Sequence, residues 1–288
     1  MVPNSEAEPH LDLEAEALRR EIQWLLSTEC KRVFARIRQL LLGVSISLHE
    51  ASSGRSAPLC CKSREPATSS EDEPLLLTAV VGSTALTALR IHLTLPRWNQ
   101  DMPYSALLGR MSVPLPALVT MQNRVAQAIA SLGVGHATLP TARTSLQQVL
   151  ALISSAVNAV TLVPPPTDMA VTPPAASLVT PSTTGQPPSL SSPPGSLGTS
   201  SVATALREQL HPPPPADLVI DVRAAGRPPR LYVSATVVRA SDGAVVMGRV
   251  VSAGLDAVEE RLQLLENAAG EAASLLAKVE VLSECADL

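Results

Sequence analysis

Few residues of this sequence have the types and spacing that catalysis requires. It contains no G-x-S-x-G nucleophile turn, no H-E-x-x-H zinc motif and no phosphate-binding loop, and its five histidines lie in unrelated segments. Gly133-Val134-Gly135 is similar to half of a dinucleotide-binding turn, but Thr138 stands at the third glycine position. The end of a helix explains these glycines better. The sequence therefore predicts no catalytic residue, no cofactor and no enzyme activity.

The four cysteines are the next residues able to do chemistry. Cys30, Cys60, Cys61 and Cys285 form neither a C-x-x-C pair nor a spaced framework, which favours reduced thiols in a cytoplasmic protein. His49 with Cys60 and Cys61 offers three zinc ligands, one fewer than a structural site uses, so no metal site is predicted. Lipid modification of the Cys60-Cys61 pair stays open.

The segment Pro96, Arg97, Trp98, Asn99 and Gln100 is the candidate protein contact. A strand ends at the proline, and an arginine, an aromatic ring and two amides follow together. Arginine and tryptophan are enriched in the energetic centres of protein interfaces. The alternative is a turn at the end of the strand whose tryptophan covers the edge of the core. Both interpretations remain open from the sequence.

Composition excludes several classes of partner. The net charge is −4 and aromatic residues make up 2 % of the chain, so there is neither excess positive charge for phosphates nor a set of rings for stacking bases. Lys31, Arg32, Arg36 and Arg38 form a local basic cluster, which we interpret as a solvated or salt-bridged helix face. The N-terminus lacks a secretory signal. We expect a soluble protein that does not bind nucleic acid.

Hydrophobic spacing predicts the elements that position these residues. Apolar residues recur at helical steps in residues 12–44, beginning with Leu18, Ile22 and Leu25 and continuing through Cys30, Val33, Ile37, Leu40 and Val44, as in a coiled-coil or bundle seam. Further helices are predicted from Pro114 to Leu132, from a cap at Thr141 to Val160, over 202–210 and over 255–282. Alternation predicts strands at 75–81, 89–95, 218–222, 231–237 and 244–251, the last two joined at Ser241-Asp242-Gly243.

These elements predict an α+β fold with two discontinuous domains. Residues 12–50, 113–162 and 254–284 are expected to form an elongated helical bundle. Residues 75–100 and 216–252 are expected to form a small antiparallel β domain with one shared sheet, because each set has too few strands to stand alone. Residues 51–74 read as a loop. Residues 163–215 contain more than half of the chain's 26 prolines and are predicted to be a disordered Pro/Ser/Thr-rich insertion.

Several ordered stretches resemble the Rogdi family. Arg20-Glu21-Ile22-Gln23-Trp24-Leu25-Leu26 is similar to the family's opening helix, and Leu93 to Gln100 to its strand-end motif. Asn123 to Ile129 is similar to its second helix, and Pro215 to Val222 to the strand after its middle segment. The Pro/Ser/Thr-rich insertion and the scarcity of aromatic residues depart from the family pattern.

The resemblance implies a function. The family includes the small subunit of the RAVE complex, which regulates the vacuolar proton ATPase, so it implies a non-enzymatic subunit that promotes assembly of this V-ATPase. The implied partners are a large β-propeller subunit and the peripheral sector of the pump, with recruitment from the cytoplasm to vacuolar or endosomal membranes through those partners. The alternative is a generic coiled-coil scaffold or tether with no role in the pump.

Overall fold

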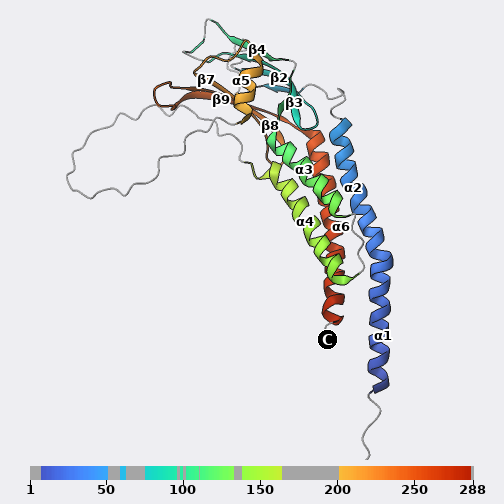
Figure 1. The fold of residues 1–288 in the computed structure, drawn as a ribbon. Coiled ribbons are helices and arrows are strands. Elements are labelled where there is room, and N and C mark those ends of the chain that lie inside the picture. Colours follow the sequence, from blue (N-terminus) through green and yellow to red (C-terminus); the bar gives the residue numbers. More distant parts are fainter. Residues whose placement is uncertain are drawn as a thin grey trace, which may run out of the picture. The chain divides into compact units, whose positions relative to one another are not determined.

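The chain folds as two units, each assembled from separate stretches of sequence (Figure 1). The helical unit comprises residues 1–55, 116–163 and 255–288, and the β unit comprises residues 56–115 and 164–254. The computed structural model describes residues 8–50, 59–62, 75–95, 98–99, 102–109, 111–132, 138–163 and 201–286. The class is α+β with two antiparallel sheets, which confirms the predicted class.

Helices from the N-terminal, middle and C-terminal parts of the chain pack together in the helical unit (Figure 1). They are α1 (Glu8–Trp24), α2 (Cys30–Glu50), α3 (Pro116–Ser131), α4 (Leu139–Thr161) and α6 (Asp256–Ala286). Helix α2 lies against α3 and α6, and α4 lies against the same two helices. The predicted apolar stripes supply most of this core, which includes Ile37, Leu118, Leu146, Val149, Leu265 and Val279. In α2, Leu41 belongs to the core, whereas the predicted Leu40 is half-buried.

A π-helical turn, η1 (Leu25–Glu29), joins α1 to α2 and explains an irregularity in the apolar stripe. The step from Leu25 to Cys30 is five residues, whereas the other steps from Ile22 to Val44 are three or four. The backbone N–H of Cys30 donates to the Leu25 carbonyl, five residues earlier. A π turn holds one residue more than an α turn. Leu25 and Cys30 therefore face the same side of the helix, and both are buried.

The N-terminal cap of helix α4 is Thr138, three residues before the predicted cap at Thr141. The side chain of Thr138 accepts from the backbone N–H of Thr141, and the Thr141 hydroxyl accepts from the backbone N–H of Thr138. This reciprocal capping box satisfies two backbone donors. Pro140, which lacks an N–H, lies in the first turn, where none is needed. The prediction of Thr141 as the cap was therefore wrong, although Thr141 belongs to the cap.

The β unit contains two sheets, so the prediction of one shared sheet was wrong. The first sheet has the order β1-β2-β3-β4-β6, with β5 also paired to β3, and the second has the order β7-β8-β9. Their bounds are β1 Leu59–Lys62, β2 Leu75–Val81, β3 Ala85–Leu93, β4 Tyr104–Leu108, β5 Val113–Pro114, β6 Leu210–His211, β7 Leu218–Ala225, β8 Arg230–Val238 and β9 Val245–Gly254.

The physical reason for two sheets lies in the connections. Strands β7, β8 and β9 follow one another through short turns, and each pairs with its neighbour in sequence. The antiparallel pairing of β8 with β9 confirms the predicted hairpin. Gly243 in its turn has φ +68°, an angle that glycine adopts without strain. Of the described residues beyond position 200, only the two residues of β6 belong to the first sheet, where they pair with β4.

Three further predictions differ from the structure in their bounds. Residues 59–62, predicted as loop, form β1, because this short apolar run pairs with the edge of β2. Val113–Pro114, predicted at the start of a helix, pairs with β3, and α3 begins at Pro116. Residues 201–215 were assigned to the insertion, but they include α5 (Ser201–Gln209), where a short helix was predicted, and β6.

Other predictions lie outside the described residues. These are the loop segments 51–58 and 63–74, the turn at Gly133-Val134-Gly135, and residues 164–200 of the predicted insertion.

Candidate protein-contact sites

Trp98, the centre of the predicted contact segment, connects the two sheets of the β unit. Its indole Nε1–H donates to Oδ2 of Asp217 at 2.7 Å. Asp217 immediately precedes β7, and its carbonyl accepts from the N–H of Val238 at 2.7 Å. Trp98 follows β3 by a few residues, so this hydrogen bond links the end of the first sheet to the start of the second. Trp98 is half-buried.

Asn99 closes the turn at the end of β3. Its side-chain Oδ1 accepts from the backbone N–H of Leu95 at 2.6 Å, and its Nδ2 donates to the carbonyl of Leu93 at 2.8 Å. An asparagine that satisfies nearby backbone groups in this way stabilises a turn. Trp98 and Asn99 thus both have intramolecular hydrogen-bond partners. Pro96, Arg97 and Gln100 lie outside the described residues, so the contact itself stays a prediction.

The bond between Trp98 and Asp217 gives a testable effect on stability. Replacing Trp98→Phe removes the N–H donor and keeps most of the ring, so the free energy of unfolding should fall by about 1 kcal/mol. Asp217→Asn keeps an acceptor oxygen and should cost less. Chemical denaturation followed by far-UV circular dichroism would measure both. Equal stability of Trp98→Phe and the wild type would show that the bond contributes nothing to the fold.

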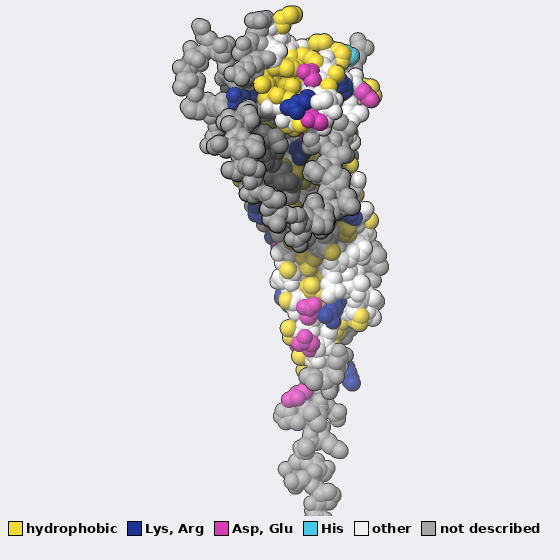
Figure 2. All heavy atoms as spheres, turned by 90° about the vertical axis from the view of Figure 1, so that its left-hand side faces the viewer, with side chains coloured by type: hydrophobic (Ala, Val, Ile, Leu, Met, Phe, Trp, Pro, Cys, Tyr) yellow, Lys and Arg dark blue, Asp and Glu magenta, His cyan; other side chains and the backbone are white. Residues whose placement is uncertain are grey.

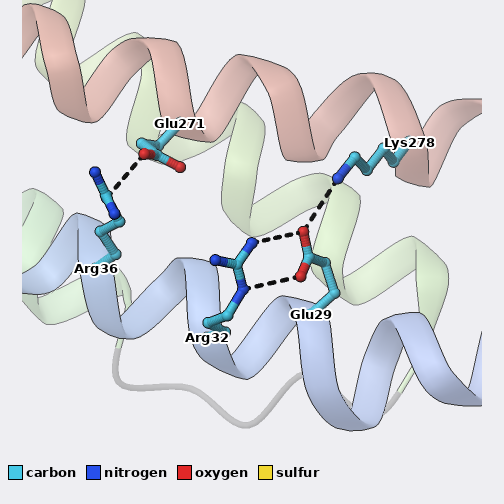
Figure 3. Close-up of polar contacts among 5 residues, drawn as sticks. All are labelled: Glu29, Arg32, Arg36, Glu271 and Lys278. Atoms are coloured by element: carbon cyan, nitrogen blue, oxygen red, sulfur yellow. Dashed lines mark hydrogen bonds and ion pairs between the residues drawn. The ribbon is translucent and has the colours of Figure 1, made fainter.

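The helical unit contains a polar cluster at the π turn, centred on Glu29 (Figure 3). Glu29 is 7 % exposed and accepts two hydrogen bonds from Arg32, both 3.0 Å long, through Nε and Nη2. Nζ of Lys278, on α6, donates to the same carboxylate at 3.1 Å. Bidentate arginine pairs are among the stronger charge-assisted hydrogen bonds. The cluster therefore joins α6 to the start of α2.

A second ion pair repeats this connection two turns away with the charges exchanged (Figure 3). Arg36 on α2 pairs with Glu271 on α6 at 2.8 Å. Seven residues separate Glu29 from Arg36, and seven separate Glu271 from Lys278, in opposite directions along the antiparallel helices. A slip of seven residues would place Glu29 opposite Glu271 or Arg36 opposite Lys278. The two pairs thus oppose a register slip between α2 and α6.

The environment of the π turn alters two pKa values. Hydrogen bonds from Arg32 and then Lys278 lower the pKa of Glu29 from 4.5 to about 2. Burial raises the pKa of the adjacent Cys30 thiol, with a further contribution from the negative charge of Glu29. Glu29 is therefore ionised at neutral pH, and Cys30 is a protonated thiol in the core.

Sequence reasoning missed the role of Glu29 and Lys278. The available signal was the five-residue step of the stripe, which places an acidic residue next to the buried Cys30. The predicted interpretation of the basic cluster on this helix is supported for two residues, because Arg32 and Arg36 form ion pairs. Lys31 and Arg38 are exposed.

A small pocket lies between α5 and β7. It has a volume of about 260 Å³ and is lined by Ala203, Thr204, Arg207, Pro214, Leu218, Val219 and Ile220. Arg207 is the single charged residue of this lining, and its Nη2 donates to the carbonyl of Pro214 at 3.4 Å. The pocket is smaller than most ligand sites and contains no pair of titratable groups for acid–base catalysis.

Exposed apolar side chains gather on the β unit. In the view of Figure 2 they lie at the upper end, around a few basic and acidic groups. Among the described residues of this unit, the large apolar side chains that are exposed are Leu76, Met102, Leu107, Met111 and Val246. Such residues close to charged groups are typical of protein-contact surfaces.

Metal sites and membrane-spanning helices are two further features to consider for the described part of the chain. No group of three or more His, Cys, Asp or Glu residues there could hold a metal ion. His49, Cys60 and Cys61 were the possible zinc ligands in the sequence, and their side chains lie outside that part. Among the helices described, none is long and apolar enough to cross a membrane.

Comparison with known proteins places the chain in a family. No curated protein matches this chain. A family model described as "Rogdi leucine zipper containing protein" matches residues 21–224, well over half of the sequence. The match extends from α1 through the π turn and the first sheet into β7, and so includes Glu29, Trp98 and Asp217. The resemblance drawn from the sequence is thereby confirmed: the chain belongs to the Rogdi leucine zipper family.

Proposed function

We propose that this protein is a non-enzymatic subunit of a RAVE-like complex that promotes assembly of the vacuolar proton-translocating ATPase. It bridges a large β-propeller subunit and the peripheral sector of the pump. It acts in the cytoplasm and reaches the vacuolar or endosomal membrane through these partners. The observation that carries the proposal is the family match over residues 21–224, which includes parts of both units.

The structure supports a binding role in two ways. First, each unit is built from segments far apart in sequence, an arrangement that presents surfaces from several segments at once. Second, the polar interactions of the buried Glu29 with Arg32 and Lys278 hold helices together and form no catalytic arrangement. An elongated helical bundle would give such a bridge its reach, since α6 alone has 31 residues, about 46 Å at 1.5 Å per residue.

Affinity purification of the tagged full chain from its own cells, with mass spectrometry of the associated proteins, tests the proposal. We expect a large β-propeller protein together with peripheral subunits of the pump. Replacing Arg97→Ala and Gln100→Ala together tests the predicted contact, and recovery of these partners should fall. Recovery of the chain with neither class of partner would refute the role in the pump.

A second candidate, a coiled-coil tether, is favoured by one observation. Helix α1 exposes Leu13 and Trp24, and Leu18 and Ile22 in the same helix are only half-buried. A helix that buries so little of its apolar surface offers it to another helix. Two results together would favour the tether. Analytical ultracentrifugation would show self-association that Leu18→Glu in α1 abolishes, and the affinity purification would contain no pump subunits.

A further inference from the structure

One face of the first sheet carries exposed side chains in two rows fixed by the strand register. Leu76, His92 and Ser105 form the first row, on β2, β3 and β4. Arg90, Leu107 and His211 form the second, on β3, β4 and β6. Residues opposite each other in paired strands point to the same side of a sheet. We call these six residues the outer sheet face; all six are exposed.

This face is apolar and basic. Leu76 is 38 % exposed and Leu107 is 55 % exposed, on either side of the central strand β3. The paired neighbours Leu75, Leu77, Ile91 and Leu93 point to the opposite face and are buried. Leu76 and Leu107 are therefore not part of the core of this sheet, and their burial would require a further surface.

The charge of the sheet is one-sided. The described strands of the first sheet carry Lys62, Arg90, His92 and His211 and no Asp or Glu residue, although the whole chain has a net charge of −4. Lys62 pairs with Leu76 in register, at the end of the first row. Arg90 has no ion-pair partner among the described residues. A carboxylate of a partner that reaches this face would pair with Arg90.

The side chains on this face are partly fixed before binding. Nδ1 of His92 and Oγ of Ser105 are 2.7 Å apart, within hydrogen-bond distance. The exposed Met102 and Met111 lie shortly before and shortly after β4. Methionine side chains adapt to the shape of a partner. The outer sheet face thus combines a hydrogen-bonded pair, His92 and Ser105, with flexible methionine side chains near both ends of β4.

We infer that the outer sheet face binds an acidic segment of a protein partner, with aliphatic side chains of that segment lying against Leu76 and Leu107 and a carboxylate pairing with Arg90. An anionic membrane or a nucleic acid fits less well. Basic membrane-binding clusters usually contain four to eight Lys or Arg residues, and the outer sheet face has one, Arg90, together with two leucines. A second copy of the chain would place this positive face against itself.

The inference rests on the proposed binding role, and it names the surface and the chemistry of one partner. Its test is site-specific photocrosslinking in cells that express the full chain. Leu107→p-benzoylphenylalanine places the crosslinker on the face and keeps an apolar side chain. Leu162→p-benzoylphenylalanine, at an exposed leucine beyond the end of α4, is the matched control.

We expect position 107, and not position 162, to crosslink to a peptide rich in Asp, Glu and aliphatic residues. Adding Arg90→Glu should reduce the yield about tenfold, since repulsion replaces an ion pair. Arg90→Lys should keep most of the yield, and Arg124→Glu on α3 should leave it unchanged. The circular dichroism spectrum of the purified Arg90→Glu protein shows whether the sheet remains folded. If this variant is unfolded, Leu107→Ser tests the apolar contact instead: the Leu107→Ser protein should compete less well than the wild type for binding of the isolated crosslinked peptide.

Three results would overturn the inference. They are no protein crosslink above the control, a crosslink to lipid or to a segment without acidic residues, and a folded Arg90→Glu variant with unchanged yield. The identity of the crosslinked protein separates this inference from the proposed function. An acidic segment of an unrelated protein, with neither a β-propeller protein nor pump subunits in the affinity purification, would support the surface and refute the role in V-ATPase assembly. Pump subunits that co-purify without crosslinking at position 107 would do the reverse.

Discussion

Deleting Thr28 should leave this protein folded, whereas deleting Ala35, seven residues later in the same continuous helix, should unfold it or cost about 4 kcal/mol or more. Both residues are exposed, so neither loses core contacts of its own. The difference comes from the π turn at Leu25–Glu29. Removing one residue there converts the π turn to an α turn and leaves every buried residue on both sides facing the core.

Deleting Ala35 has no such remedy. Even if the π turn relaxes, residues 30–34 move one position along the helix, a rotation of about 100°. Phe34 then occupies the exposed position of Ala35, and Arg32 occupies the position of Val33, which is 4 % exposed. Exposing a phenylalanine and burying an unpaired guanidinium are both costly. Denaturant unfolding of the two deletion variants measures the difference. Equal destabilisation by the two deletions would show that the π turn does not serve to maintain register.

The second large effect concerns Glu29. Replacing Glu29→Gln should lower the free energy of unfolding at pH 7 by about 2 kcal/mol, because the amide cannot accept charge-assisted hydrogen bonds from both Arg32 and Lys278. The matched control is Glu16→Gln on α1, which pairs with Arg20 on an exposed helix surface. Exposed pairs of this kind contribute about 0.5 kcal/mol.

The effect of Glu29 should depend on pH in a defined direction. The pKa of Glu29 is lowered from 4.5 to about 2, so its contribution to stability is present above the unfolded-state value. That contribution is lost as the pH falls from 4.5 towards 2. The difference in unfolding free energy between wild type and Glu29→Gln should be largest near pH 7 and shrink below pH 4.5. A difference that stays constant between pH 7 and pH 3 would contradict the assigned ionisation.

The sequence alone predicted most elements, because periodicity is a local property. Strand β2 was predicted with the bounds observed, Leu75–Val81, from its position and composition. The alternation of β3 placed His92 on the exposed side, as the structure has it. Helix α6 was predicted from repeats of three and four residues. Each of these patterns is carried by neighbouring residues, whose side chains must fall on one face of a helix or strand.

The structure around the candidate contact segment could be predicted only in part from the sequence. Its position at the end of β3 was correct, but nothing near Trp98 in the sequence indicates Asp217, which lies more than a hundred residues away. The same holds for Glu29 and Lys278. A hydrogen bond between distant segments leaves no periodic signal, so the residues of such a pair can be named only after the chain has folded.

What the sequence by itself determined is the identity of the helices and of the strands β2, β3, β7, β8 and β9, the discontinuous order of helical and β segments, and the family; the strands β1, β4, β5 and β6 were not predicted. What only the tertiary structure decided is how those elements pair. β6 joins the first sheet, while β7, β8 and β9 form their own. The π turn brings Glu29 towards α6. Side-chain spacing is fixed by the covalent chain, whereas strand pairing and helix register are chosen among alternatives by the total burial and hydrogen bonding of residues far apart in sequence.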